Sequence, residues 1–564
     1  MFRLMRYLGS RARTTPGDKP PPSETNPTSV LELCHQGEAH LASGDIQRAI
    51  ESYRQAILLS STDADASVRL AQLLAKQRQF SEAHAVLVAP GSIGGSNWLH
   101  LLELGKAAEE EGDKDEAIAC YRTVLQLTPP YTDIHPWPEC HWRLASLLFG
   151  LGRLQEALAV MEEFVAINTS SPDAYGLIGT ILSQLGRSAE AAEMFEKVLQ
   201  MTDRRHALAA DYAAATSMAL RRWKEAGEYA KLASTLNPSY QNKFRNAYLT
   251  LLSGNFETGW KEFEEVLPLI GDPNNPEGAQ YLRNALGTEK YWRGQCLDGK
   301  TLTVWMEHGL GDAIMMARFI PLIRKRFGKA RLVILAFPQL TRLFSQLDVD
   351  QVLPIPDRRE IQRITSDYHC SIMSLPYVFR LGALSDIPNC APYLEIPASE
   401  SKSWADRLMP FSGVKAGLVW SGNPKNVEGR ARSMHFGSLS RLFGVEGVTW
   451  FSLQKGTAAE ELSTLRYPII DWMGDCKDLL DTAALVANLD LVVSVDTSVA
   501  HLAGALGKPV WLMNRYESDW RWMVDRQDSP WYPTMRIFNQ KHPMDWHSTV
   551  AEVAAALDAV AESP

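Results

Sequence analysis

The segment with the clearest chemical content joins an apolar run at 489–493 to a stretch of small residues. Asp496, Thr497, Ser498 and His501 lie at this junction, directly after an expected buried strand. A strand that leads into a helix leaves free backbone N–H groups at the helix start, where a diphosphate binds well. We expect Thr497 and Ser498 to donate hydrogen bonds to phosphate, and His501 either to reach a phosphate oxygen or to be an internal structural histidine. Asp496 would repel a diphosphate, so it is expected to orient the loop or to bind a sugar hydroxyl.

A second candidate site follows another expected strand, where the chain reads Glu-His-Gly-Leu-Gly-Asp. Gly309 and Gly311 allow the backbone to turn tightly and leave room for a ligand. Asp312 falls in the first turn of the next helix, where a carboxylate either caps the helix or acts as a general base. His308 is a second acid–base candidate or a polar loop residue. If Asp312 is only a cap, Glu307 or His308 becomes the better candidate for the base.

A third loop offers hydroxyl groups and positive charge after the strand expected at 415–420. It reads Trp-Ser-Gly-Asn-Pro and is followed by two arginines. Hydroxyls, backbone N–H groups and guanidinium groups are suitable ligands for phosphate. We therefore expect Ser421, Asn423 and Arg432 to bind the donor, whereas Arg430 is typical of a solvated loop.

A fourth loop follows the strand expected at 448–453. Gln454 and Lys455 lie at the strand end, and Lys455 is either a phosphate-binding cation or an ordinary surface lysine. Glu460 follows on a stretch where glutamate is usually solvated. No Asp-x-Asp motif lies at a strand end in a context typical of a metal–diphosphate site. Basic side chains and a helix N-terminus would replace the metal, so we expect no metal and no other cofactor.

The elements that must position these loops are preceded by a repeated helical region. Small, turn-forming and large apolar residues recur there in phase: Ala49, Ala83 and Ala117, then Ala157 and Ala191, at intervals of 34; Gly44, Gly112 and Gly152 five residues before an alanine; and Tyr53, Tyr121 and Phe195 four residues after one. Small alanines let two helices approach closely, and glycines serve the turn between them. This is the tetratricopeptide pattern. It predicts six units over about 30–240 and a degenerate seventh that ends at Phe263.

The rest of the chain alternates apolar runs with amphipathic stretches, which indicates a parallel sheet with covering helices. Strands are expected at 301–306, 331–336, 351–355, 415–420, 448–453, 489–495 and 509–513, and helices at 312–327, 339–347 and 547–561. The expected fold is a tetratricopeptide α-superhelix followed by two Rossmann-like α/β domains. The expected divisions are a disordered tail at 1–29, repeats at 30–270, a connector at 271–300, an acceptor-side domain at 301–410 and a nucleotide-sugar-binding domain at 411–564.

These motifs resemble the ADP-heptose:lipopolysaccharide heptosyltransferases and their relatives fused to tetratricopeptide repeats. The resemblance covers about 254–545 and includes the strings Asp-Trp-Arg-Trp at 519–522 and Ser-Pro-Trp-Tyr-Pro at 529–533, whose aromatic residues are expected mainly to pack. It implies a glycosyltransferase of the two-domain B type with Asp312 as the general base. It also implies that Glu460 occupies the place of a ribose-binding carboxylate. Glu307-His308 stands where many relatives have Glu-Gln, so His308 departs from their pattern.

Bulk properties restrict the remaining possibilities. The chain has 564 residues and a net charge of −9, which suits several domains but not a broad nucleic-acid surface. Its 7 cysteines are scattered and form no Cys-x-x-Cys pair, which fits a reducing compartment and gives no metal signal. No apolar run is long enough to span a membrane. The basic start at 1–8 fits a frayed tail better than contact with an anionic membrane surface, and we expect a cytoplasmic bacterial protein.

The sequence thus predicts a metal-independent, inverting glycosyltransferase that uses a nucleotide-diphospho-sugar. The acceptor would be a protein or a glycan, and the groove of the repeats would recruit the acceptor or a protein partner. The alternatives are a tetratricopeptide adaptor whose transferase-like domain is inactive, and a scaffold that senses sugar nucleotides.

Overall fold

The computed structural model describes residues 29–61, 63–89, 97–127, 137–267, 280–356, 360–388, 391–424, 427–464 and 467–561. The tail that the sequence predicts to be disordered lies outside these residues, apart from Ser29, which caps the first helix. The chain divides into two compact units, Met1–Gly186 and Arg187–Pro564, and each is described by itself.

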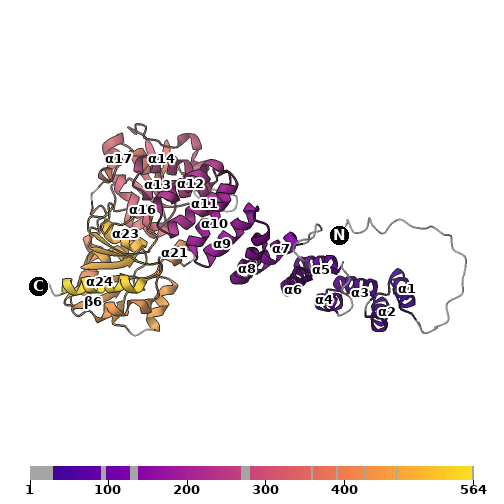
Figure 1. Ribbon diagram of the computed structural model, residues 1–564. Helices are drawn as coiled ribbons and strands as arrows, with labels where there is room; N and C mark the ends of the chain where they lie inside the picture. Colours follow the sequence, from indigo (N-terminus) through magenta and orange to yellow (C-terminus); the bar gives the residue numbers. More distant parts are fainter. Residues whose placement is uncertain are drawn as a thin grey trace. The chain divides into compact units, whose positions relative to one another are not determined.

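The first unit consists of helices, each of which packs against the next along the chain (Figure 1). They are α1 (Val30–Ala42), α2 (Ile46–Leu59), α3 (Ala64–Lys76), α4 (Phe80–Val88), α5 (Asn97–Glu111), α6 (Lys114–Leu127), α7 (Trp137–Gly150), α8 (Leu154–Ile167) and α9 (Pro172–Gln184). Gly44 and Gly112 turn the chain between paired helices with φ of +82° and +87°, a region that favours glycine. Ala49 and Ala83 are fully buried. The predicted helical repeat is confirmed.

Charged side chains join neighbouring repeats in this unit. Arg54 lies 2.5 Å from Glu82, and Arg122 pairs with Glu156, so both pairs link the second helices of successive repeats. The side chains of these pairs are about two-fifths exposed, with values from 41% to 44%. Exposed pairs of this kind contribute up to about 1 kcal/mol each. They therefore help to define the register between repeats, and the apolar layers supply most of the stability.

The second unit begins with more helices of the same kind. They are α10 (Ser188–Met201), α11 (Ala207–Ala219), α12 (Trp223–Leu236), α13 (Tyr240–Leu252) and α14 (Phe256–Val266). A single apolar core then runs from Ala214 and Ala226 through Phe256 and Trp260 into the first sheet. The last repeats and the first sheet therefore share one interior.

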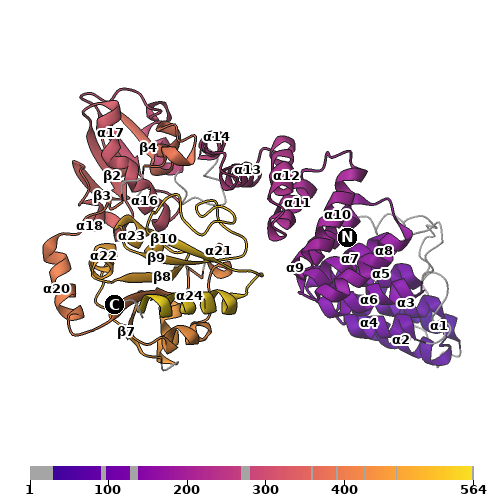
Figure 2. The same ribbon diagram turned by 60° about the vertical axis from the view of Figure 1, so that its left-hand side comes forward.

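Two parallel sheets follow in the second unit (Figure 2). The first has the order β3-β2-β1-β4 and the second the order β10-β9-β8-β5-β6-β7. The first comprises β1 (Thr301–Trp305), β2 (Arg331–Ala336), β3 (Gln351–Pro354) and β4 (Tyr368–Ser371), with α16 (Leu310–Met316), α17 (Ile320–Phe327), α18 (Thr341–Phe344) and α19 (Leu375–Val378). The second comprises β5 (Val414–Val419), β6 (Val448–Ser452), β7 (Ile469–Asp471), β8 (Leu491–Val495), β9 (Val510–Asn514) and β10 (Met535–Asn539), with α20 (Ala398–Leu408), α21 (Val427–Ala431), α22 (Leu479–Ala487), α23 (Ser498–Ala505) and α24 (Trp546–Ala561).

The predicted strands all exist, with ends that differ by no more than two residues. The sequence missed β4, β7 and β10, each of which lies at an edge of its sheet, whereas the fourth edge strand, β3, was predicted. β4, Tyr-His-Cys-Ser, is almost fully buried, but its His369 and Ser371 are hydrogen-bonded inside the protein, so the strand does not appear in the sequence as an apolar run. A second core, built on Trp420 and Trp450, lies between the second sheet and α24.

The described part of the predicted connector packs against the first sheet. It contains α15 (Gln280–Leu286), which contacts β4. Tyr291 forms an isolated bridge with His369, and the backbone N–H of Trp292 donates to the His369 carbonyl at 2.8 Å. Tyr291 and Trp292 thus extend the edge of this sheet beyond β4. In the described ranges, no helix has the length and apolar character that a membrane span requires.

Candidate active site

Two segments that the sequence singled out, nearly 190 residues apart, meet where α16 packs on α23. Gly311 lies so close to His501 that an added Cβ would stand 2.7 Å from the imidazole Cδ2. A glycine is therefore required here for close approach. The contact brings the Gly-rich turn after β1 and the Asp-Thr-Ser turn after β8 to one place.

Asp312 lies in the first turn of α16, but it does not cap the helix. The N-cap residue is Gly309, and no side-chain cap is present. One oxygen of Asp312, Oδ1, accepts two hydrogen bonds from the guanidinium of Arg521, of which the Nε bond is 2.9 Å long. Arg521 also donates to Asp519 at 2.6 Å and stacks over Trp520 with its central carbon 4.4 Å from the ring centre. The guanidinium thus joins Asp312, which follows a strand of the first sheet, to Asp519, which follows a strand of the second.

A second carboxylate–arginine pair lies beside the first. Arg432 donates to Asp496 Oδ2 at 3.0 Å, and the His501 Nε2 atom lies 4.0 Å from Asp496 Oδ1. The His501 Nδ1 atom is 2.9 Å from the Tyr532 hydroxyl, and its ring stacks on Trp522 at 5.0 Å. Because His501 is buried among aromatic rings, its surroundings are those of an internal side chain. It still faces the carboxylate of Asp496.

Burial and charge set the protonation states of these groups. Burial alone would raise the pKa of Asp312, but the positive charge of Arg521, the neighbouring His308 and the hydrogen bonds from Arg521 together outweigh it and hold the pKa below the usual value. The same balance, with Arg432 as the main cation, lowers the pKa of Asp496. Burial lowers the pKa of His501 to about 4. At neutral pH both carboxylates are therefore ionised and the imidazole is uncharged.

Glu307, at the end of β1, is in the opposite state. Burial raises its pKa to about 8, and the hydrogen bond that Ser371 donates to its Oε1 only partly offsets this. The nearby carboxyl of Glu264, on α14, also raises it. Among the described residues its other oxygen, Oε2, has no hydrogen-bond partner. Glu307 is therefore protonated at neutral pH.

His308 occupies a left-handed backbone conformation with φ of +63° and is exposed. Its ring lies 5.6 Å from that of Phe263 and 6.5 Å from that of Phe244, which belong to the last two repeat helices. The turn after β1 is therefore in contact with the end of the repeats. The sequence did not predict this contact.

The two expected donor loops are joined to each other by Gln454. Its side-chain oxygen accepts from the backbone N–H groups of Trp420 and Ser421 at 3.1 and 2.9 Å. Its nitrogen donates to the carbonyls of Ser421 and Lys455, both at 3.0 Å. Because the buried amide is fully engaged with backbone, Gln454 positions these loops here and does not face a ligand. Ser421 is half-buried in the assembled turn, with its hydroxyl 3.2 Å from that of Ser433.

Other predicted donor residues are less closely assembled. Lys455 is exposed, and its Nζ donates to the Cys476 carbonyl. Glu460 is exposed on a short 3-10 helix, Thr457–Ser463, and Asn423 is exposed in its loop. No contact recorded for the described part of the chain joins Lys455 or Glu460 to Asp312 or Asp496. A nucleotide-sugar that contacted Lys455 or Glu460 as well as Asp312 or Asp496 would therefore have to be the link between them.

The start of α23 is half-buried. Thr497 is its N-cap residue, but its hydroxyl lies 3.0 Å from that of Ser494 and does not cap the helix. Ser498 opens the helix and is also half-buried. The two residues keep the position after β8 that the sequence predicted.

Arg521 is the site residue that sequence reasoning missed. The string Asp-Trp-Arg-Trp was noted for its aromatic residues, and these indeed pack: Trp520 lies 5.3 Å from Trp260 and 6.1 Å from Trp531, edge-on in each case. In the sequence, the only sign of this role was that the arginine lies between two tryptophans. Its partner Asp312 lies 209 positions away.

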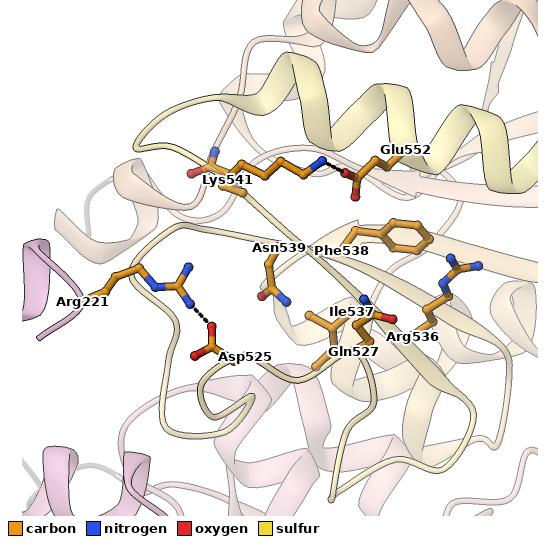
Figure 3. A pocket seen from close by; sticks show the side chains of 10 residues that line it. Arg221, Asp525, Gln527, Arg536, Ile537, Phe538, Asn539, Lys541 and Glu552 are labelled. Carbon is orange, nitrogen blue, oxygen red and sulfur yellow. Dashed lines mark hydrogen bonds and ion pairs between the residues drawn. The ribbon is translucent and has the colours of Figure 1, made fainter. Parts of the chain in front are cut away.

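A pocket of about 410 Å³ lies elsewhere in the second unit, beside the edge strand β10 (Figure 3). Its charges are mixed, and Arg221 pairs with Asp525 while Lys541 pairs with Glu552 at its rim. None of the site residues predicted from the sequence lines it.

Comparison with known proteins separates the chain into two parts. Tetratricopeptide repeat families match residues 40–92, 102–174 and 172–203, and glycosyltransferase family 9 (heptosyltransferase) matches residues 473–523. The last range contains Asp496, His501 and Arg521.

Individual relatives match most of the chain or one of its two parts. Protein FlbA of Caulobacter vibrioides is 25% identical over 519 residues, which cover 81% of this chain and 83% of that protein. Tetratricopeptide repeat protein 7B of Homo sapiens is 29% identical over 97 residues, 17% of this chain and 11% of that protein. Among solved structures, ADP-heptose LPS heptosyltransferase II of E. coli is 16% identical with a TM-score of 0.36, covering 46% of this chain and 98% of that one. YrrB, a TPR protein with an unusual peptide-binding site, is 21% identical with a TM-score of 0.26, covering 34% of this chain and 96% of that one.

Proposed function

We propose that this chain, which carries tetratricopeptide repeats in its N-terminal half and a heptosyltransferase-family domain at its C-terminus, is a metal-independent inverting glycosyltransferase. It would move a sugar from a nucleotide-diphospho-sugar to a hydroxyl of a protein or glycan. The observation that carries the proposal is the meeting of the Asp312 turn with the Asp496–His501 turn, held by Arg521.

Asp312 is the better general base of the two buried acids. It is ionised at neutral pH, whereas Glu307 is protonated. Two carboxyl groups whose pKa values are pushed apart in this way are suited to different roles. Asp312 Oδ1 is occupied by Arg521, and no bond to Oδ2 is recorded among the described residues. Oδ2 is therefore the atom that would accept the proton of the acceptor hydroxyl.

The chemical step would be a single displacement. The acceptor oxygen forms a bond to the anomeric carbon as its proton passes to Asp312. The bond from that carbon to the diphosphate breaks, and the electron pair stays on the phosphate oxygen. One displacement inverts the configuration, and fixed donors at the leaving phosphate stabilise the developing charge.

The charges around Asp312 restrict where the diphosphate can lie. Three carboxylates, Asp312, Asp519 and Asp496, face two guanidinium groups, those of Arg521 and Arg432. This surplus of negative charge repels a phosphate. We therefore place the diphosphate toward the start of α23 and the Ser421 turn, with Lys455 as the cation, and the acceptor hydroxyl toward Asp312.

The same pairing favours the alternative function, an adaptor with an inactive transferase domain. Asp312 and Arg432 are each engaged with a partner inside the protein. The same internal pairing is compatible with a scaffold that binds sugar nucleotides but does not transfer the sugar. In either role the repeats would bind a protein, because repeats of this kind present extended concave surfaces.

Two measurements on the full chain distinguish these functions. A ligand that binds only the folded protein raises its melting temperature, so a thermal-shift series with nucleoside diphosphates tests the donor site. Nucleotide release from a panel of diphospho-sugars then tests turnover. We expect both to be positive. Binding without release would support the sensing scaffold, and the absence of both would support the adaptor.

A further inference from the structure

The repeats of the first unit contain three side chains with different metal-binding atoms. His84 lies on α4, and Glu116 and Cys120 lie four residues apart on α6. One atom of each, an imidazole nitrogen, a carboxylate oxygen and a thiol sulfur, lies within 4.8 Å of the other two. Over the ranges that the structure describes, no other trio of His, Cys, Asp or Glu is this close.

Neighbouring hydroxyls orient the first two groups. The Thr123 hydroxyl donates its own proton to the Ala119 carbonyl at 2.9 Å, so toward His84 Nε2, at 3.1 Å, it acts as the acceptor. His84 therefore carries its proton on Nε2. The Ser81 hydroxyl donates to Glu116 Oε2 at 2.7 Å, which leaves Oε1. Outer partners of this kind fix the orientation and tautomer of metal ligands in proteins.

This arrangement turns two electron-rich atoms toward each other. With Nε2 protonated, a neutral His84 presents the lone pair of Nδ1, which lies 2.5 Å from Glu116 Oε1. That oxygen is buried and accepts no hydrogen bond among the described residues. A positive species must lie between the two atoms, either a second proton on the imidazole or a metal ion.

Cys120 distinguishes the two possibilities. Its side chain is fully buried, and the structure records no hydrogen bond for its thiol among the described residues. A proton between His84 and Glu116 leaves this thiol unused. A divalent cation bonds all three atoms, and its two charges are balanced by one carboxylate and one thiolate, which a buried site requires.

We propose that His84, Glu116 and Cys120 bind one zinc ion between two repeats of the superhelix. A set of one nitrogen, one oxygen and one sulfur ligand suits zinc, which bonds them at about 2.0–2.3 Å. The three atoms must then approach to about 3.5 Å, which the flexible glutamate side chain allows. Binding breaks the S–H bond of Cys120, forms a zinc–sulfur bond and releases the proton to solvent.

The ion would replace a salt bridge as the link between these repeats. Successive second helices are joined by Arg54–Glu82 and Arg122–Glu156 on either side, whereas α4 and α6 meet at His84 and Glu116. A metal bond is stronger than an exposed ion pair, so the stiffness of this part of the superhelix would depend on zinc. This site is separate from the transferase chemistry, which the proposed function treats as metal-free.

The test uses the full chain, stripped of metal and titrated with Co²⁺ as a spectroscopic substitute for zinc. We expect one equivalent to bind, with a thiolate-to-cobalt charge-transfer absorption that zinc abolishes by displacement. We also expect zinc to raise the melting temperature of the repeats that hold it. Cys120→Ala and His84→Gln should lose the absorption and the stabilisation.

Cys140→Ala is the matched control, because Cys140 is a buried free cysteine on the neighbouring helix α7. This variant should keep both effects. Circular dichroism of each variant verifies that it is folded. If folded Cys120→Ala binds cobalt like the natural chain, or if the natural chain gives no stoichiometric charge-transfer band, the cluster is a protonated His84–Glu116 pair and the zinc site is rejected.

Discussion

Asp312 carries the sharpest prediction at the scale of single residues. Replacement by Asn keeps its size but removes the basic oxygen, and we expect turnover to fall by about 100-fold or more. Asp519→Asn is the control, because Asp519 also pairs with Arg521 but is not placed on the Gly-rich turn. Each variant should lose about 1–3 kcal/mol of unfolding free energy, since each leaves Arg521 with one acid. Steady-state kinetics and denaturant unfolding measure both effects. Equal losses of turnover would mean that Asp312 only anchors the arginine.

Glu307 predicts a pH dependence of stability. Its pKa is raised in the folded chain to about 8, so the unfolded chain releases this proton at lower pH than the folded chain. The contribution of Glu307 to the free energy of unfolding is therefore fully present below the pKa that it has in the unfolded chain. It declines as the pH rises toward 8, by up to about 1.4 kcal/mol per pH unit. Glu307→Gln should therefore be nearly neutral at pH 5 and stabilising at pH 8. Urea unfolding at both values measures the difference. A variant that is equally affected at both would show that Glu307 is ionised in the folded state.

Lys455 and the start of α23 are expected to do the work of a metal in the transferase site. A chelator should therefore leave sugar transfer nearly unchanged. The measurement is best made in the Cys120→Ala background, so that loss of zinc from the repeats does not affect the result. An absolute need for added Mg²⁺ or Mn²⁺ in that background would overturn the metal-free donor site.

At the scale of elements, the packing of α16 on α23 depends on one missing methyl group. Gly311→Ala places a Cβ 2.7 Å from the His501 ring, and overpacking of this kind costs about 1–3 kcal/mol. Gly227→Ala, on α12 with open space around it, should be neutral or slightly stabilising. Thermal unfolding compares them. Adding His501→Ala to Gly311→Ala should recover part of the loss, and a purely additive double variant would contradict the direct contact.

How much the sequence predicted also depends on the element. Central strands such as β2 and β8 are apolar except for Arg331 and Ser494, and their position was clear from the sequence. The edge strands β4 and β7 are short and β10 includes Arg536 and Asn539, and none of the three was predicted, although the edge strand β3 was. The turns after β1 and β8 were located because each follows a central strand. Arg521 and the contact of His308 with Phe263 were not, because they depend on chain segments that only the fold brings together.

At the scale of the whole molecule, the division after Gly186 predicts where the chain can be shortened. Removal of 1–186 should leave a folded fragment that still binds a nucleoside diphosphate, while use of the acceptor falls. Removal of 1–240 also takes away α11 and α12, whose Ala214 and Ala226 belong to the core of the α/β region. That shorter fragment should be less stable. Thermal shift with and without ligand compares the two, and equal stability would show that α11 and α12 do not support the sheet.

The shared core of the last repeats and the first sheet also determines how the superhelix ends. Repeat arrays usually need a terminal helix with a polar outer face, because an open end exposes apolar surface. Here Phe256 and Trp260 of the final helix pair are buried in a common interior with the sheet, so the α/β region itself closes the array. Opening of the last helices and opening of the sheet are therefore one cooperative event. Amide hydrogens of α13, α14 and β1 should exchange with a common opening free energy, so a protein bound to these last repeats would also slow exchange in β1, the strand that leads into the Asp312 turn.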